Sequence, residues 1–489
     1  MATQSRSLAT PTPRLAIGPL YSGNVAVFCL ALQFVCQTLL LFPELAAFRI
    51  PFRIAAFATS LAALILIPAL ASATPYPGRP LGIMVLVIIG LNILQPDTAL
   101  MAGIATWFLN LAILAPIFWS SRLAFRASHF RKILLVLFFY HTCSSIVGVL
   151  QVHYPGRFQP ALSTVYSKQS EEQLGGLQIV LADGSLVFRP MGLTDTPGGA
   201  ASSGFYACLL GTCILFSERS AFLRLCAFVA LGAGLFCLYL SQVRVMIVLL
   251  AIDWIAFVFL LARTGRVGQA ARLAVMLAFI VPAIFLYAFA VGGETVTNRL
   301  MTLTEGGASD VYYSNRGLFL DYTLNTLLPR YPLGGGLGRW GMMCAYFGDP
   351  NNSVWAEIQW TGWLYDGGVP LMLTYGMAIL FAIWVNWKGA SESSSEQRQL
   401  WFALVFAYSV GALASTFSAL LFAGQAGMEF WLINAALFQA NTQEAHLERG
   451  RPVAKKAPSD NSRKLVASFG QNRSGATRAS PNGAFGRRK

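Results

Sequence analysis

Length, composition and charge already exclude most classes of protein. The chain has 489 residues, of which 11% are charged and 55% hydrophobic, and its net charge is +14. Soluble domains carry about a quarter charged residues, so this hydropathy excludes an ordinary soluble enzyme. The composition predicts an all-α polytopic membrane protein. Each helical span needs about 20 apolar residues, because the backbone must satisfy its own hydrogen bonds across ~30 Å of hydrocarbon.

Apolar runs of suitable length begin after a short polar segment. Residues 1–24 contain Pro11 and Pro13 and lack the apolar core and cleavage site of a signal peptide, so we expect a cytoplasmic N-terminal tail. About twelve transmembrane helices follow and form a predicted membrane domain over residues 25–440. The predicted spans are 25–44, 54–73, 81–95, 99–119, 133–153, 199–217, 222–240, 243–262, 271–292, 364–387, 400–422 and 427–440. A tight turn at Ser241–Arg244 is predicted to join the seventh and eighth spans as a hairpin.

The distribution of Lys and Arg sets the predicted orientation. These residues favour the cytoplasmic side of short loops. Most of them fall in cytoplasmic segments when both termini are placed inside, and Arg122–Lys132 is the strongest anchor. This orientation puts two long loops, 154–198 and 292–363, outside the cytoplasm. We expect the chemistry of the protein in these loops.

The C-terminal segment 441–489 is predicted to be a basic, disordered cytoplasmic tail. From Gly450 onward it is rich in Lys, Arg, Ser, Asn and Gly and has almost no large apolar residue. One interpretation is a solvated tail that follows the positive-inside rule, and the other is attraction to anionic membrane lipids. No nucleic-acid-binding motif accompanies the charge, so nucleic acid is not an expected partner.

The sequence predicts no metal and no cofactor. Seven of the eight cysteines lie in apolar runs, which leaves Cys344 outside them, and the four histidines are scattered without ligand spacing. No P-loop accompanies these residues, so the use of ATP or a nucleotide sugar is not expected.

Three arginines near the outer ends of predicted spans are candidate phosphate ligands. Arg189 lies in the first long loop, Arg244 begins the eighth span, and Arg316 opens a segment with leucines at helical spacing. A guanidinium group keeps its charge and forms bidentate hydrogen bonds to phosphate oxygens, so such groups could hold a pyrophosphate without a metal. The alternatives are that Arg244 reaches the headgroups, that Arg316 is a solvated or headgroup-facing charge, and that Arg189 is an ordinary loop residue.

The second long loop adds a glycine run and acidic residues. Gly334–Gly338 permits close backbone approach, either to a ligand or within a plain turn. After the turn at Asp349, Glu357 lies among Trp355, Trp360 and Trp363, which suit a membrane interface or, alternatively, a sugar-stacking platform. Low polarity there would raise the pKa of Glu357 toward that of a useful general base, with Asp349 as the neighbouring candidate.

Four segments taken together resemble the bacterial O-antigen ligase and O-antigen polymerase superfamily, in the family's order. They are Arg189–Gly192 followed by Thr194–Pro197, Ser241–Arg244, Arg316 with Pro332–Gly338, and Asp366–Leu371. The segments cover residues 185–390, and each is loose when taken alone. Ligases of this family commonly carry a histidine about nine residues before the acidic residue that matches Asp366. This chain has Glu357 there or, in a looser register, Asn351 or Asn352. Leu371 also replaces the final glycine of the motif that begins with Asp366.

The resemblance implies a metal-independent glycosyltransferase of the bacterial inner membrane, with helices around a lipid-accessible cavity (a GT-C-like architecture). Such an enzyme takes an undecaprenyl-pyrophosphate-linked oligosaccharide as donor and a glycan as acceptor at the periplasmic face, with other polysaccharide-assembly proteins as further partners. The missing histidine favours polymerisation of repeat units, as in O-antigen or exopolysaccharide synthesis, over ligase-type transfer to lipid A core or protein. The sequence also leaves open a polysaccharide or lipid transporter and a non-catalytic membrane scaffold. A transporter predicts internal repeats, which the sequence does not show.

Overall fold

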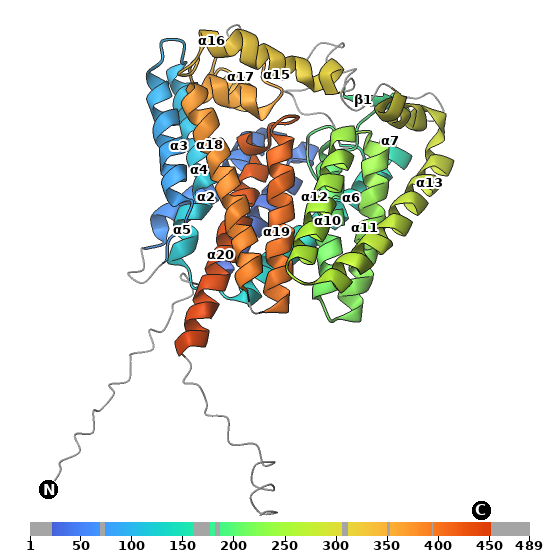
Figure 1. Ribbon diagram of the computed structural model, residues 1–489. Coiled ribbons are helices and arrows are strands. Elements are labelled where there is room, and N and C mark those ends of the chain that lie inside the picture. The colour runs from blue at the N-terminus through green and yellow to red at the C-terminus, as the bar shows by residue number, and fades with distance from the viewer. Residues whose placement is uncertain are drawn as a thin grey trace, which may run out of the picture. The chain divides into compact units, whose positions relative to one another are not determined.

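The computed structural model describes residues 22–68, 74–160, 177–180, 186–305, 312–349, 353–393 and 395–450 (Figure 1). The elements of the first half are α1 (Asn24–Leu39), η2 (Pro43–Phe48), α2 (Arg49–Leu66), α3 (Arg79–Leu91), η3 (Asn92–Leu94), α4 (Leu100–Leu114), α5 (Pro116–Trp119), η4 (Ser120–Arg122), α6 (Ala127–His153), α7 (Pro155–Phe158), β1 (Gln178–Val180) and β2 (Leu186–Phe188). Those of the second half are α10 (Gly199–Ser217), α11 (Ala221–Ser241), α12 (Arg244–Arg263), α13 (Val267–Glu305), η5 (Tyr313–Gly317), α15 (Leu318–Tyr322), η6 (Thr323–Leu327), α16 (Leu328–Arg330), α17 (Gly341–Phe347), α18 (Gln359–Glu392), α19 (Glu396–Ser415), η8 (Leu421–Ala423) and α20 (Gln425–Gly450).

The chain divides into two compact units, Met1–Glu444 and Ala445–Lys489. The first unit holds the helices described below. Of the second unit, residues 445–450 are described, as the last turns of α20. The predicted tail was expected to begin at residue 441, but α20 continues as a helix to Gly450. The rest of that tail, and the predicted N-terminal tail up to residue 21, lie outside the described residues.

Several helices of the described residues are long and apolar enough to cross a membrane, which makes the chain a multi-pass all-α membrane protein. Seven qualify on length and hydropathy, or eight if α4 and the segment Pro116–Arg122, which meet at a bend of 41°, form one span. Helices α1 and α3 with η3 are apolar but shorter. Each of the twelve predicted runs overlaps a helix, but the predicted number of spans is not established by these lengths.

The helices of the first unit pack with one large apolar core. Buried side chains from α1, α6, α10, α12, α18, α19 and α20 form a continuous cluster, in which Trp119, Trp431 and Tyr375 are among the largest fully buried residues. Outward-facing side chains such as Ile65, Phe279 and Leu286 are exposed and apolar. This pattern suits helices surrounded by hydrocarbon, because lipid is as apolar as the core.

The predicted turn at Ser241–Arg244 is confirmed. Helix α11 ends at Ser241, Gln242 takes a left-handed conformation with φ of 52°, and α12 begins at Arg244. At the other end of α11, the Ser220 hydroxyl accepts a hydrogen bond from the Leu223 backbone N–H, which is an N-cap. The turn therefore positions Arg244 at the start of a helix, as the sequence predicts.

The two predicted long loops contain more secondary structure than the sequence indicated. The first holds α7 and an antiparallel hairpin of β1 and β2, although residues 161–176 and 181–185 fall outside the described part of the chain. In the second, α13 continues to Glu305, and short helices from η5 to α17 follow residue 311. Helices α15, α16 and α17 lie across one end of the longer helices (Figure 1). We call this the α15–α17 end.

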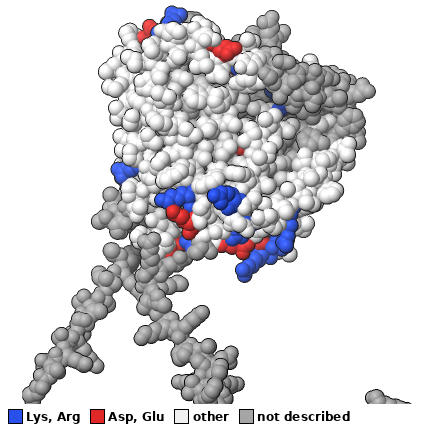
Figure 2. Space-filling view, viewed as in Figure 1, with Lys and Arg blue, Asp and Glu red and all other residues white. Residues whose placement is uncertain are grey.

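Ion pairs join the helix connections at the opposite end of the first unit. Arg131 of α6 pairs with Glu218 after α10, Arg266 before α13 pairs with Glu396 of α19, and Arg398 pairs with Glu444 of α20. Figure 2 shows charged side chains gathered at this end and a broad, mostly uncharged band between them and the α15–α17 end. Charged residues are rare inside a membrane-embedded helical bundle, and Asp253, in the middle of α12, is fully buried.

Candidate functional site

The glycine run of the second predicted loop packs against a kink in α18. The backbone of Gly368 has a φ of 63° inside that helix, so the chain changes direction there. The Gly335 N–H donates to the Tyr365 carbonyl at 2.9 Å, and the Val369 N–H donates to the Pro332 carbonyl at 2.9 Å. A Cβ on Gly368 would lie 2.3 Å from that Pro332 oxygen. The glycines therefore allow two backbones to meet.

The same run also binds the connection between α3 and α4. A Cβ on Gly334 would lie 2.1 Å from the Asn92 Oδ1, and one on Gly338 would lie 2.5 Å from the Ala102 backbone. The Leu337 N–H donates to the Thr98 hydroxyl at 2.9 Å. The glycines permit close approach, and here they approach other parts of the protein. The run therefore links the predicted loop to two membrane helices.

Asp366, the acidic residue of the fourth motif, is buried at this junction. Its side chain is 5% exposed, and its Oδ1 accepts a hydrogen bond from the Trp340 indole N–H at 2.9 Å. Trp340 precedes α17, so this bond fixes the start of α17 to α18. The Asp366 carboxylate therefore has a structural hydrogen-bond partner inside the protein.

Arg316 and Glu357 form an ion pair, although they are 41 positions apart. Their side chains are 39% and 26% exposed, so solvent reaches both. Partial burial lowers the pKa of the Arg316 guanidinium from its usual value, yet arginine keeps its charge at physiological pH. The structure therefore brings one predicted phosphate ligand into contact with the predicted base.

Hydrogen bonds on both sides of this pair hold it over the connection between α19 and α20. The Gln359 N–H donates to the Thr416 carbonyl at 3.0 Å, and the Gln359 side chain accepts from the Phe422 N–H at 2.9 Å. The Thr323 and Thr361 hydroxyls lie 2.6 Å apart, which joins η6 to α18. The segment that carries the pair is therefore fixed to the ends of three membrane helices.

Asp349, the second candidate base, lies at the far end of α17. Its side chain is exposed, and its carbonyl accepts a hydrogen bond from the Cys344 thiol at 3.7 Å. Residues 350–352, which connect it to the segment of Glu357, fall outside the described residues. Glu357, by contrast, follows that gap and is in contact with the predicted phosphate ligand Arg316.

Arg189 lies beside the start of α12. Its N–H donates to the Leu177 carbonyl at 2.9 Å, so it continues the β hairpin. At Gly198, where φ is 83°, a Cβ would lie 3.9 Å from the Arg189 Cδ and 3.6 Å from the Val243 Cγ2. Val243 directly precedes Arg244. The fold thus brings Arg189 close to the residue that precedes Arg244.

The Arg316–Glu357 pair and the residues around Gly198 lie at the same end of the helices. Asp253 of α12 contacts Gly411 of α19, while Phe259, further along α12, and Phe406, earlier in α19, both contact Trp387. The two helices are therefore antiparallel, and the start of α12 lies level with the end of α19, over which Glu357 is held. Convergence of all three arginines on one ligand stays a prediction.

Among the described residues, some polar groups were not singled out from the sequence alone, and two of them are the following. Arg53, at the start of α2, forms an ion pair with Asp195 of the first predicted loop. Arg49 and Arg53 at i, i+4 spacing before an apolar run were the available signal. In α20, Glu429 is 3% exposed and accepts from Gln425 at 2.9 Å. A carboxylate inside a predicted span marks a candidate functional position by itself.

The aromatic residues of the second loop divide between core and surface. Trp363 is 3% exposed and stacks on Tyr375 with ring centroids 4.7 Å apart, so it belongs to the core. The ring centroids of Trp360 and Trp363 lie 5.4 Å apart. Trp360 is half-buried, whereas Trp355 is 61% exposed. Trp355 is the member of the trio available to a membrane interface or a sugar.

Comparisons with known proteins assign no family. No protein-family model matches the chain, and a search of curated proteins finds no relative. Among the described residues, no group of three or more His, Cys, Asp and Glu side chains is arranged to hold a metal ion. The case for a function therefore rests on the geometry above.

Proposed function

We propose that this protein polymerises lipid-linked oligosaccharide repeat units, as a metal-independent glycosyltransferase of the bacterial inner membrane. In this proposal about twelve helices cross the membrane in a GT-C-like arrangement, both termini are cytoplasmic, and the α15–α17 end faces the periplasm. The donor is an undecaprenyl-pyrophosphate oligosaccharide, and the acceptor is another glycan chain. The observation that carries the proposal is the contact of Arg316 with Glu357 at the end of the helices where Arg189 lies beside the start of α12.

The proposed chemistry uses one carboxylate and three cations. Glu357 accepts the proton of an acceptor sugar hydroxyl, whose oxygen attacks the anomeric carbon of the donor sugar. The bond between that carbon and the pyrophosphate oxygen breaks, and its electron pair leaves with the pyrophosphate. Arg189, Arg244 and Arg316 stabilise the negative charge that develops there. The Arg316–Glu357 pair is partly exposed, so a phosphate can compete for the guanidinium without a large cost of desolvation.

The first prediction is that transfer depends on these side chains. Purified protein in lipid, given the lipid-linked oligosaccharide without added metal, should yield longer lipid-linked glycans. Arg244→Ala should slow transfer by ~10²-fold or more, as the loss of one preorganised donor does elsewhere. Glu357→Gln should slow it by a factor of ~10²–10⁴, the usual contribution of a general base.

The matched control is Arg330→Ala. Arg330 is an exposed arginine of the same segment whose guanidinium lies 5.1 Å from the Tyr331 ring, and its loss should leave transfer near the wild-type rate. Folded Arg244 and Glu357 variants with wild-type activity would refute the assigned roles. Transfer to lipid A core instead of a growing repeat would indicate a ligase. If the wild type transfers nothing, a transporter or scaffold role gains support.

A further inference from the structure

A groove with apolar walls opens between α2, α4 and α17. Its volume is about 210 Å³, and its lining includes Ile54 and Ala58 of α2, Ala105 and Phe108 of α4, and Met342 and Tyr346 of α17. Ile54 and Phe108 are exposed at 51% and 48%, so the groove is open at the side of the bundle. A void of this size accepts a short stretch of hydrocarbon chain, and it extends from a membrane helix to the α15–α17 end.

One cation borders this groove, and a second lies one helical turn away. Arg53 contacts Asp195 through one terminal nitrogen and the Met342 sulfur through the other. The Nε atoms of both Arg49 and Arg53 are buried and have no hydrogen-bond partner among the described residues. Residues four apart share one face of a helix, so two guanidinium groups with spare donors lie on one face of α2. Buried donors of this kind favour an anionic acceptor.

We propose that this groove holds the first isoprene units of the lipid-linked donor, with the donor pyrophosphate at Arg53. The inference rests on the proposed function and adds a donor-binding residue to it. A hydrocarbon chain gains little by leaving lipid for an apolar groove, so the charged contact at the rim has to select the ligand. In the ligand-free protein Arg53 forms an ion pair with Asp195. A guanidinium has five N–H donors, so Arg53 can bind a phosphate as well as Asp195.

The position of Asp195 supports this assignment over binding of an ordinary phospholipid. Asp195 lies in the stretch between Arg189 and Gly198, which leads to the start of α12. A pyrophosphate at Arg53 would therefore lie near the segment that carries Arg189.

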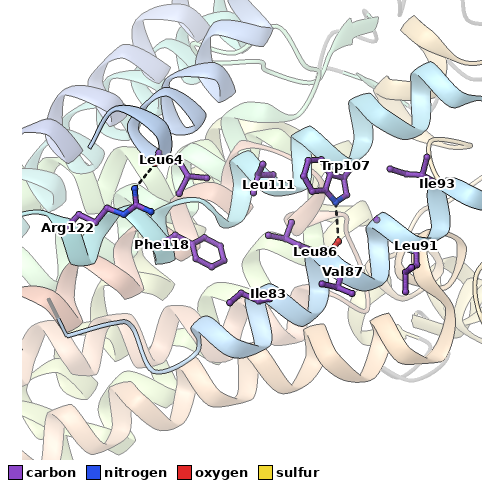
Figure 3. A pocket seen from close by; sticks show the side chains of 11 residues that line it. Leu64, Ile83, Leu86, Val87, Leu91, Ile93, Trp107, Leu111, Phe118 and Arg122 are labelled. Carbon is purple, nitrogen blue, oxygen red and sulfur yellow. Dashed lines mark hydrogen bonds between the residues drawn. The ribbon is translucent and has the colours of Figure 1, made fainter. Parts of the chain in front are cut away.

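A larger groove on the other side of α4 provides the contrast. It has a volume of about 600 Å³ and is lined by Ile83, Leu86, Val87, Trp107 and other apolar residues (Figure 3). Its cation, Arg122, donates to the carbonyls of Leu64 and Ile67 at 2.7 and 2.8 Å. Both bonds come from Nη1, which satisfies the last carbonyls of α2, so this cation lies at the opposite end of α2 from Arg53. Ordinary bilayer chains are enough to fill it.

The test measures donor binding separately from transfer. The probe is a photoreactive undecaprenyl pyrophosphate, titrated against the full-length protein in nanodiscs, with phosphatidylglycerol as competitor. Arg53→Gln should weaken binding ~10-fold or more, the change expected when a charge-assisted hydrogen bond is lost. Ala58→Trp, which fills the groove from a lipid-exposed position and leaves Arg53 in place, should weaken binding to a similar extent. Val87→Trp in the larger groove is the matched control and should bind as the wild type does.

The outcomes separate this inference from the proposed function. Wild-type binding by both folded variants would overturn the groove assignment, even if the wild type transfers glycan. Equal competition by phosphatidylglycerol would overturn it too, because the groove would then be a general phospholipid site. Binding that depends on Arg53 and Ala58, in a protein without transfer activity, would support the groove and refute glycosyl transfer.

Discussion

At the scale of single residues, Cys344 gives a sharp test of the α15–α17 end. Its side chain is 3% exposed, and its thiol is held against the Asp349 carbonyl. Burial raises the pKa of this thiol, Asp349 raises it further, and Arg339 opposes the change. The thiolate is the reactive form, so a raised pKa means little thiolate at neutral pH.

We therefore predict slow labelling of Cys344 by a water-soluble maleimide at pH 7. The rate should rise ~10-fold by pH 8, because below the pKa the thiolate fraction increases tenfold for each pH unit. A Cys344→Ser variant gives the background from the other cysteines. Fast labelling that does not change with pH would show that Cys344 is exposed and that α17 is packed differently.

The sequence identified some site residues for physical reasons and missed others. Arg316 and Glu357 were found because charged residues stand out in a polar loop between apolar runs, but their contact depends on the chain path of α15 to α18. Arg53 was missed because an arginine just before a span looks like a headgroup anchor. Its pairing with Asp195, which is 142 positions away, is a tertiary contact without a local signal.

At the scale of elements, the kink of α18 is the feature on which the second predicted loop depends. A left-handed residue inside a helix is normal for glycine and strained for other residues. Gly368 has this conformation, and the Pro332 carbonyl lies where a Cβ would be. Gly376, in the same helix, has ordinary space, since the nearest atom to its Cβ position is the Trp360 Cη2 at 3.8 Å.

We predict that Gly368→Ala destabilises the protein by ~2 kcal/mol or more, because it adds backbone strain to a clash with a carbonyl. Gly376→Ala should be neutral or stabilise by up to ~1 kcal/mol through its better helix propensity. Thermal unfolding of both variants in the same detergent makes the comparison. Equal unfolding midpoints for the two variants would contradict the left-handed conformation of Gly368 at the kink.

Element types were predictable where the apolar pattern was long, and less so in the loops. Twelve apolar runs each overlap a helix, because hydrocarbon leaves few other solutions for the backbone. The β hairpin has strands of three residues each, too short for a periodic signal. The glycine run was interpreted as a turn or a ligand loop because its packing partners, Asn92 and Gly368, are distant in the sequence.

At the scale of the whole molecule, arginine–carboxylate ion pairs join segments at both ends of the first unit. At the end opposite α15–α17, arginines pair with acidic residues of neighbouring connections, as Arg266 does with Glu396. The Arg266 hydrogen bond and charge lower the pKa of Glu396. Because the folded-state pKa is depressed, this pair stabilises the fold at neutral pH and loses that contribution as acid protonates Glu396. Its exposure keeps the contribution below ~1 kcal/mol.

We predict that the two ends face opposite sides of the membrane. Arg330→Cys, at an exposed position of α16, should react with an impermeant maleimide in cells whose outer membrane alone is permeabilised. Arg219→Cys, at an exposed position between α10 and α11, should react only after the inner membrane is opened. The unsubstituted protein gives the background. Reaction of both from the same side would refute the orientation.

The paired backbone contacts between the glycine run and α18 have a mechanical consequence. Gly335 with Tyr365 and Val369 with Pro332 join the segment before α17 to a membrane helix on both sides of its kink. A force applied to that segment is transmitted to α18 through main-chain hydrogen bonds rather than through side chains that can change rotamer. The segment and the helix would then move as one lever with its pivot at Gly368.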